Sequence, residues 1–274
     1  CMQNPEKMLF HMRETYSCTL LIDGDKVEKL NTKTDQTLSP LVYPSWHPSG
    51  KYVAFSVNKT KQSVSYERLG IGWKVFDSAS DVVVYDTQKH EIVTSPLLSS
   101  EGAFETFPTF SPDGNTLYFC SAKARTMPKE YDQVRYDLCS VSFDPATRRF
   151  GTVVDTLYKA SEIDKSVSFP RVSPDGKYLL YTLSGYGNFS IWHKDADLYM
   201  IDLSICEVIH WRRRIATMWK AIIHGVAIVV GSCLAAVGWM VCIQGCSSLI
   251  SMRKDRLANL SCYPRRIRIF IFAL

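Results

Sequence analysis

The chain has 274 residues, 46% of them hydrophobic and 22% charged, as expected of a globular protein. Its net charge of +5 averages two unlike segments, because residues 204–274 hold ten lysines and arginines against only Glu207 and Asp255. Residues 1–203 are therefore mildly acidic, and this body argues against a nucleic-acid partner.

Cysteine use divides the chain in the same way. Four cysteines lie in residues 1–203 and five lie in residues 204–274. No pair has Cys-x-x-Cys spacing, and Cys242 and Cys246 have no histidine beside them, so the sequence predicts no metal site and no haem site. We expect the body cysteines to be small buried hydrophobes. Cys1 is either a lipidated N-terminus or a truncation point.

The first predicted element is a hairpin in residues 9–31, turning at Asp23-Gly24-Asp25. Three further segments then align without gaps: "PSWHPSGKYVAFS" from Pro44, "PTFSPDGNTLYFC" from Pro108 and "PRVSPDGKYLLYT" from Pro170. A unit of this length that recurs along a chain indicates propeller blades or a solenoid.

Each unit predicts a tight turn followed by a buried strand. The proline fixes φ at the first corner, the next side chain can bond the local backbone, and the glycine accepts a positive φ. The structural motif residues are Trp46, Pro48, Gly50, Phe110, Pro112, Asp113, Gly114, Val172, Pro174, Asp175 and Gly176. We predict strands at Tyr52–Phe55, Leu117–Phe119 and Tyr178–Tyr181.

A further strand closes each unit, in "DVVVYD" from Asp81, "YDLCSVSFD" from Tyr136 and "DADLYMIDL" from Asp195. Extended segments such as "HEIVTSPL" and "FGTVVDTL" follow two of them. No long amphipathic helix is expected in residues 1–203. The stretch between Gly50 and Asp81 is longer than its counterparts, either as an inserted loop or through a local change of reading frame at Val64–Arg68.

These motifs resemble the TolB-type β-propeller repeat, the Pro-Asp-Gly relative of the WD repeat, over roughly residues 40–203. The resemblance implies an all-β fold, a partial β-propeller of about three four-stranded blades. It also implies an exported protein of the periplasm or bacterial cell envelope. Because propellers usually have four to eight blades, the body is expected to be incomplete.

Residues 204–274 have two interpretations. In the first, a helix at about residues 219–246 spans a membrane, since Ala221–Val241 has His224 as its one ionisable residue and could cross about 30 Å of hydrocarbon. In the second, the segment is translated out of frame. Shifting the frame forces Asp-Gly across Trp239–Val241, and suitable codons give "SWSSNSRWVVFS" near residue 224, which matches Ser45–Ser56. We predict the frameshift, entering near Ser204–His210.

The sequence predicts no catalytic residues, no cofactor and no metal. No Gly-x-Ser-x-Gly elbow occurs, and "GYGN" at Gly185 lacks the context of a dinucleotide site. Asp195 and Asp197 could hold a cation, but we interpret them as turn formers. His47 and His11 are interpreted as structural or exposed.

Three functional hypotheses follow. The preferred one is a non-catalytic scaffold, not an enzyme, that binds a protein or glycan in the cell envelope. The second is the propeller of a larger enzyme or redox protein. The third is a membrane-tethered propeller, which requires a genuine 219–246 span or a lipidated Cys1. The first is preferred because binding is the default role of the fold.

Overall fold

A computed structural model describes residues 7–12, 18–30, 41–59, 63–67, 72–76, 79–190, 193–205, 207–209, 229–230 and 233–234. The N-terminal sheet is antiparallel, with β1 (Lys7–Met12), β2 (Cys18–Asp23) and β3 (Lys26–Leu30) in that order. Its second turn is at Gly24, which has φ of 57°. The hairpin predicted around Asp23 is therefore confirmed.

Three four-stranded antiparallel sheets follow, each with its strands in chain order. The first contains β4 (Leu41–Trp46), β5 (Tyr52–Asn58), β8 (Ser80–Asp86) and β9 (Glu91–Val93). The second contains β10 (Ala103–Phe110), β11 (Thr116–Lys123), β12 (Asp137–Asp144) and β13 (Arg149–Tyr158). The third contains β14 (Ser166–Val172), β15 (Tyr178–Ser184), β16 (Asp197–Asp202) and β17 (Glu207–Ile209). The predicted all-β partial propeller is confirmed, and these sheets are blades 1, 2 and 3.

Short elements lie in the connections. The long stretch between β5 and β8 of blade 1 contains a hairpin of β6 (Ser63–Glu67) and β7 (Gly72–Phe76). This hairpin is an insertion in the blade. The described helices are two 3₁₀ turns, η1 (Tyr131–Gln133) and η2 (Ala160–Ile163).

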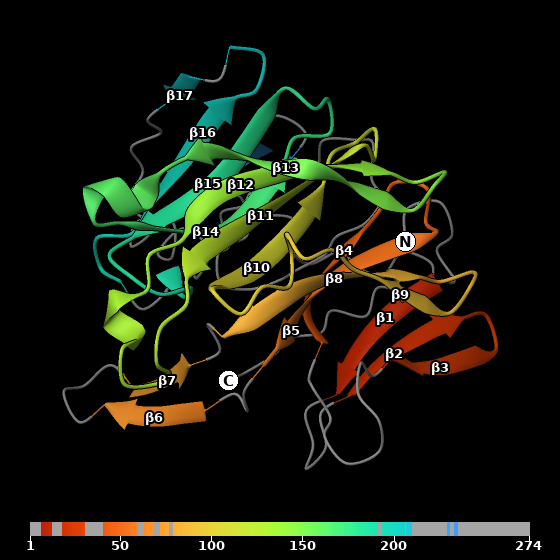
Figure 1. Cartoon of the computed structure of the whole chain (residues 1–274), viewed down its shortest axis with the longest axis horizontal. Coiled ribbons are helices and arrows are strands. Elements are labelled where there is room, and N and C mark those ends of the chain that lie inside the picture. The colour runs from red at the N-terminus through yellow and green to blue at the C-terminus, as the bar shows by residue number, and fades with distance from the viewer. Residues whose placement is uncertain are drawn as a thin grey trace, which may run out of the picture.

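The sheets stand one after another in chain order, from red to blue in Figure 1. A separate apolar core fills each interface between neighbouring sheets. Leu21 and Leu30 of the N-terminal sheet pack with Phe55 of blade 1, while Ala54 of blade 1 packs with Phe119 of blade 2. Cys120 and other side chains on the far face of blade 2 pack against Leu179 and its neighbours in blade 3. Blades 1 and 2 therefore bury both faces against neighbouring sheets, which explains their nearly continuous apolar strands.

The first strand of each blade is the innermost, since β10 contacts both β4 and β14. All three carry a bulge at the same place, where an aromatic residue precedes proline: Tyr43, Phe107 and Phe169 have φ of 54°, 52° and 53°. The ring centroid of Phe107 lies 4.5 Å from that of Tyr43 and 4.2 Å from that of Phe169. A left-handed backbone is unfavourable for these residues, and the packing of the three rings offsets its cost.

The motif residues occupy equivalent places. Trp46, Phe110 and Val172 end the innermost strands, and each packs in a different one of the three interface cores. The turns that follow contain Pro48, Pro112 and Pro174 and end at Gly50, Gly114 and Gly176, whose φ values are 71°, 79° and 73°. Asp113 and Asp175 accept hydrogen bonds within their turns, from the amides of Asn115 and Lys177. The predicted positive φ of the glycines and the predicted hydrogen bonds of the aspartates are confirmed.

Part of residues 204–274 is described. Strand β17 pairs with β16 and completes blade 3, beyond the boundary predicted at residue 203. Inside the predicted 219–246 span, Val229–Val230 (β18) and Cys233–Leu234 (β19) pair as two short strands. The rest of that span lies outside the described residues. Within the described ranges no helix is both long and apolar enough to cross a membrane.

Candidate functional site on the loop face

The two ends of the blades differ in their connections. Because the strands alternate in direction, every turn from first to second strand lies at one end of the sheets, which we call the turn face (residues 47–51, 111–115 and 173–177). The opposite end, the loop face, carries the longer connections 59–79, 124–136 and 185–196. It also carries the links between blades, 94–102 and 159–165. Binding residues concentrate on such loops, held by a rigid scaffold.

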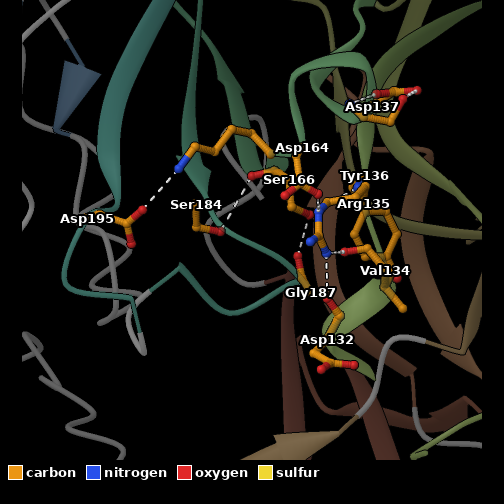
Figure 2. A network of polar contacts seen from close by, with 12 residues as sticks. Asp132, Val134, Arg135, Tyr136, Asp137, Asp164, Ser166, Ser184, Gly187 and Asp195 are labelled. Atoms are coloured by element: carbon orange, nitrogen blue, oxygen red, sulfur yellow. Dashed lines mark hydrogen bonds and ion pairs between the residues drawn. The ribbon is translucent and has the colours of Figure 1, made fainter. Parts of the chain in front are cut away.

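Two of these loops are tied to each other between blades 2 and 3 (Figure 2). The amide of Gly187 donates to the carbonyl of Val134 at 2.9 Å, and Ser166 Oγ donates to the carbonyl of Gly187 at 2.6 Å. Gly187 has φ of 67°, and a Cβ there would lie 2.6 Å from Tyr131 Oη. Glycine is therefore required for the two loops to meet.

Arg135 lies at the centre of this junction (Figure 2). Its Nε is 2.8 Å from Asp164 Oδ1, and its Nη1 donates to the carbonyls of Asp132 and Val134. Its Nη2 makes no hydrogen bond in the part of the chain that the structure describes. The guanidinium is therefore fixed in position while it keeps donors for a further ligand.

A small aromatic cluster lies beside the same cation. The guanidinium carbon of Arg135 is 5.9 Å from the ring centroid of Tyr186, within the range of a cation–π interaction. The Tyr186 ring meets His193 edge to face at 4.4 Å and Tyr131 at 5.8 Å. Tyr186 and His193 are half-buried. Half-exposed aromatic rings beside an arginine are typical of binding surfaces for proteins and sugars.

The two aspartates considered as cation ligands, Asp195 and Asp197, have different surroundings. Asp195 pairs with Lys165 Nζ at 3.0 Å, and this contact lowers the pKa of its carboxyl (Figure 2). Asp197 instead opens β16, and its buried Oδ1 has no hydrogen-bond partner among the described residues. Within the same part of the chain, no group of three or more histidine, cysteine or acidic side chains is arranged for a metal ion.

Asp197 belongs to a series that the sheet registers define. Asp81, Asp137 and Asp197 pair with Val57, Ser121 and Leu183, at the same place in each blade. In blades 1 and 2 the aspartate accepts a hydrogen bond from a serine in the link to the next blade. Ser99 Oγ is 3.1 Å from Asp81, and Ser161 Oγ is 2.8 Å from Asp137. This contact fastens each link to the preceding blade.

A buried polar group lies at the loop-face end of the interface between blades 1 and 2. Glu105 is 2% exposed, and burial, with Asp81 nearby, raises the pKa of its carboxyl to about 7. The side chain of Asn58, also 2% exposed, has no hydrogen-bond partner within the described ranges. The positions equivalent to Glu105 in the other two blades hold Leu41 and Val167. This end of the interface therefore departs from the apolar repeat.

The remaining residues considered in the sequence have structural places. His47 is buried on the turn face, where its Nε2 is 3.0 Å from the carbonyl of Gly114 in blade 2, and burial lowers its pKa. Its structural interpretation is confirmed. Cys120 and Cys139 are buried and unbridged, and burial raises the pKa of both thiols, as expected of small core residues. The side chain of His11 lies outside the described residues.

Sequence reasoning did not single out the residues of the loop face. Arg135, Tyr131 and Tyr186 lie outside the repeat, and the motif residues lie at the turn face or at the strand ends leading into it. The usable signal was the spacing: the connections between second and third strands were longer than the turns required. The stretch "GYGN" from Gly185 contains Tyr186 and Gly187, but as a sequence motif it is only an incomplete dinucleotide site.

Comparison with known proteins adds architecture only. No family model matches the chain, and no curated protein matches it. Among solved structures, one assigned to TolB from Agrobacterium tumefaciens is 17% identical with a TM-score of 0.44, over 74% of this chain and 59% of that one. An oligogalacturonate lyase in complex with manganese is 16% identical with a TM-score of 0.40, over 78% and 48%. A Synechocystis apocarotenoid oxygenase is 13% identical with a TM-score of 0.41, over 74% and 45%.

The chain thus spans about half to three-fifths of the length of these structures. They include enzymes, a lyase and an oxygenase, and this finding overturns the expectation that the chain is not an enzyme. The physical reason is that blades form a scaffold, and the residues placed on its loops decide between binding and catalysis.

Proposed function

We propose that the chain is the propeller of a TolB-like protein of the bacterial cell envelope, exported to the periplasm, and that its loop face binds a protein or a glycan there. The observation that carries the proposal is the junction of Arg135 and Tyr186. A fixed guanidinium with free donors lies against a half-buried aromatic ring, where two loops from different blades meet at Gly187.

The local electrostatics support a binding role. Arg135 Nε pairs with Asp164, whose side chain is 85% exposed, so this ion pair adds little to folding stability. The same holds for the exposed pair of Lys165 and Asp195. Charged groups that contribute little to stability, yet are held in place, are well suited to contact a partner.

The test uses immobilised peptidoglycan and detergent-solubilised envelope proteins from a Gram-negative bacterium. We expect the purified chain to bind one of the two fractions, and Tyr186→Ala to weaken that binding at least tenfold. Tyr186→Phe, which keeps the ring, should bind nearly as the parent does. Lys177→Ala removes an exposed cation on the turn face and should change nothing. Equal loss in the Lys177 variant, or no loss in Tyr186→Ala, would refute the loop face as the binding surface.

A further inference from the structure

The loop-face end of blade 2 contains a cavity of about 390 Å³. All four strands of the blade contribute to it, together with the loop 124–136 and Ser161 of η2. Its apolar lining includes Ala103, Ala122 and Val154. A volume of this size is in the range of small-ligand sites and can hold one or two sugar rings.

Three cations line this cavity, in a body that is acidic overall: Lys123, Arg125 and Arg135. Lys123 and Arg125 are exposed, and neither makes an ion pair within the described residues. Asp137 is the carboxylate of the described lining, and both of its oxygens accept hydrogen bonds from Ser161, from the amide and from Oγ at 2.8 Å. Arg135 is paired with Asp164, so the unpaired positive charge that the cavity presents, within the described residues, is that of Lys123 and Arg125.

Neutral polar groups complete the lining. Ser121, Gln133 and Thr156 place hydroxyl and amide groups around the same space. Serine and threonine hydroxyls both donate and accept, as sugar hydroxyls do, and an arginine fork matches a carboxylate. A further carboxyl, that of Glu105, does not line the cavity but interacts electrostatically with the lining residue Cys139. Its pKa of about 7 leaves it partly protonated at neutral pH, so it opposes an anion only weakly.

We propose that this cavity binds a carboxylate-bearing sugar of the uronic acid class, with Lys123 and Arg125 holding the carboxylate and Arg135 joining from the edge. This inference rests on the proposed function, because it names the chemical class of the ligand that the loop face binds. Size favours a sugar over a bare anion, since a phosphate or a free carboxylate would leave most of the cavity empty.

The test is isothermal titration calorimetry of the full chain with a uronic acid trisaccharide, the matched neutral trisaccharide and inorganic phosphate. We expect the acidic trisaccharide to bind at least tenfold more tightly than the other two, and its affinity to fall with salt. Lys123→Ala with Arg125→Ala should remove this preference, while Lys123→Arg with Arg125→Lys should largely keep it. Both residues are exposed, so the variants should fold, and Lys177→Ala is the matched control.

Equal binding of the acidic and neutral sugars would overturn the inference, as would phosphate binding as tightly as the sugar, or no binding at all. The proposed function fails separately. If Tyr186→Ala abolishes binding to an envelope fraction while the Lys123 and Arg125 variants do not, the loop face binds another partner and only the sugar inference is lost. If none of the variants affects binding, both are wrong.

Discussion

The turn face and the loop face are built from the same strands but follow different rules. On the turn face the three blades repeat one geometry: the amides of Gly50, Gly114 and Gly176 each donate to the carbonyl three residues earlier, at 2.9 Å. On the loop face the aspartates Asp81, Asp137 and Asp197 recur, but other equivalent positions differ, as at Glu105, and the loops differ in length and content. Repetition marks what folding requires of every blade, and departure from it marks where this chain does something of its own.

The largest expected effect concerns the hydrogen bond that fastens each blade to the link that follows it. In the described part of the chain, blades 1 and 2 have this bond and blade 3 does not. Among the described residues no serine hydroxyl bonds Asp197, whereas Asp81 and Asp137 each accept a hydrogen bond from a serine that lies nine residues before Pro108 and Pro170 respectively. If residues 204–274 are out of frame, the corrected frame should encode serine or threonine nine residues before the equivalent position of the motif near residue 224. Resequencing the coding DNA from codon 195 tests this directly.

A chain translated in that frame should form a fourth blade and show a larger denaturant m-value, because more surface is buried on folding. The prediction is wrong if independent sequencing reads give the present reading frame and if the chain translated in the other frame has an unchanged m-value.

The next effect concerns the bulge that all three blades share. Phe107 is 3% exposed and lies between Tyr43 and Phe169. Phe107→Ala should lower the free energy of unfolding by about 3–5 kcal/mol, because it leaves a cavity where the innermost strands meet. Phe107→Leu, which fills most of the volume, should cost less than half as much. Urea unfolding measures both, and a cost below about 1 kcal/mol for the alanine variant would show that the rings do not hold the blades together.

Two glycine-to-alanine substitutions, one on each face, compare how much stability a single added methyl group costs there. At Gly114 a Cβ would lie 2.2 Å from His47 Nε2, on a backbone with φ of 79°, so Gly114→Ala should cost about 2–4 kcal/mol. A Cβ added at Gly102, in a loop-face link, would meet no atom within 4 Å, so Gly102→Ala should change stability by no more than about 0.5 kcal/mol. Equal denaturation midpoints for the two variants would contradict this explanation of the turn face.

The smallest effect is a pH dependence at Glu105. Its pKa is about 7 in the folded chain and 4.5 in the reference state, so the folded chain binds the extra proton between these values. Its contribution to stability is therefore present at low pH and is lost as pH rises through about 7. Glu105→Gln should be more stable than the parent at pH 8, by at most about 3 kcal/mol, and the difference should vanish near pH 4.5.

Comparing the two chains at each pH cancels the opposite contribution of His47, whose lowered pKa reduces stability as pH falls below 6.5. A constant difference between pH 5 and 8 would show that Glu105 does not titrate in this range.

The sequence predicted the parts of the fold that local chemistry specifies. Proline and glycine placed the turns, and the apolar runs placed the second strands, because φ preferences and burial act over a few residues. The bulges at Tyr43, Phe107 and Phe169 were not predicted, although an aromatic residue before proline recurs in all three units. Their conformation depends on rings that meet across blades, which no single window contains.

The candidate site was less predictable for the same reason. Arg135 and Tyr186 lie far apart in the sequence and meet only because the loops of two blades come together at Gly187. The cavity cations come from β11 and from the loop after it, and these two segments contain no recognisable sequence motif. Loop length is the sequence feature that could have indicated this face, and residue type gives no further signal.

The most direct test of the central claim is hydrogen–deuterium exchange of the full chain with and without the uronic acid trisaccharide. We predict slower exchange on the loop face, in residues 121–137 and 185–190, and unchanged exchange in the turns at 47–51, 111–115 and 173–177. Protection confined to those turns, or none on the loop face at a saturating sugar concentration, would contradict the claim.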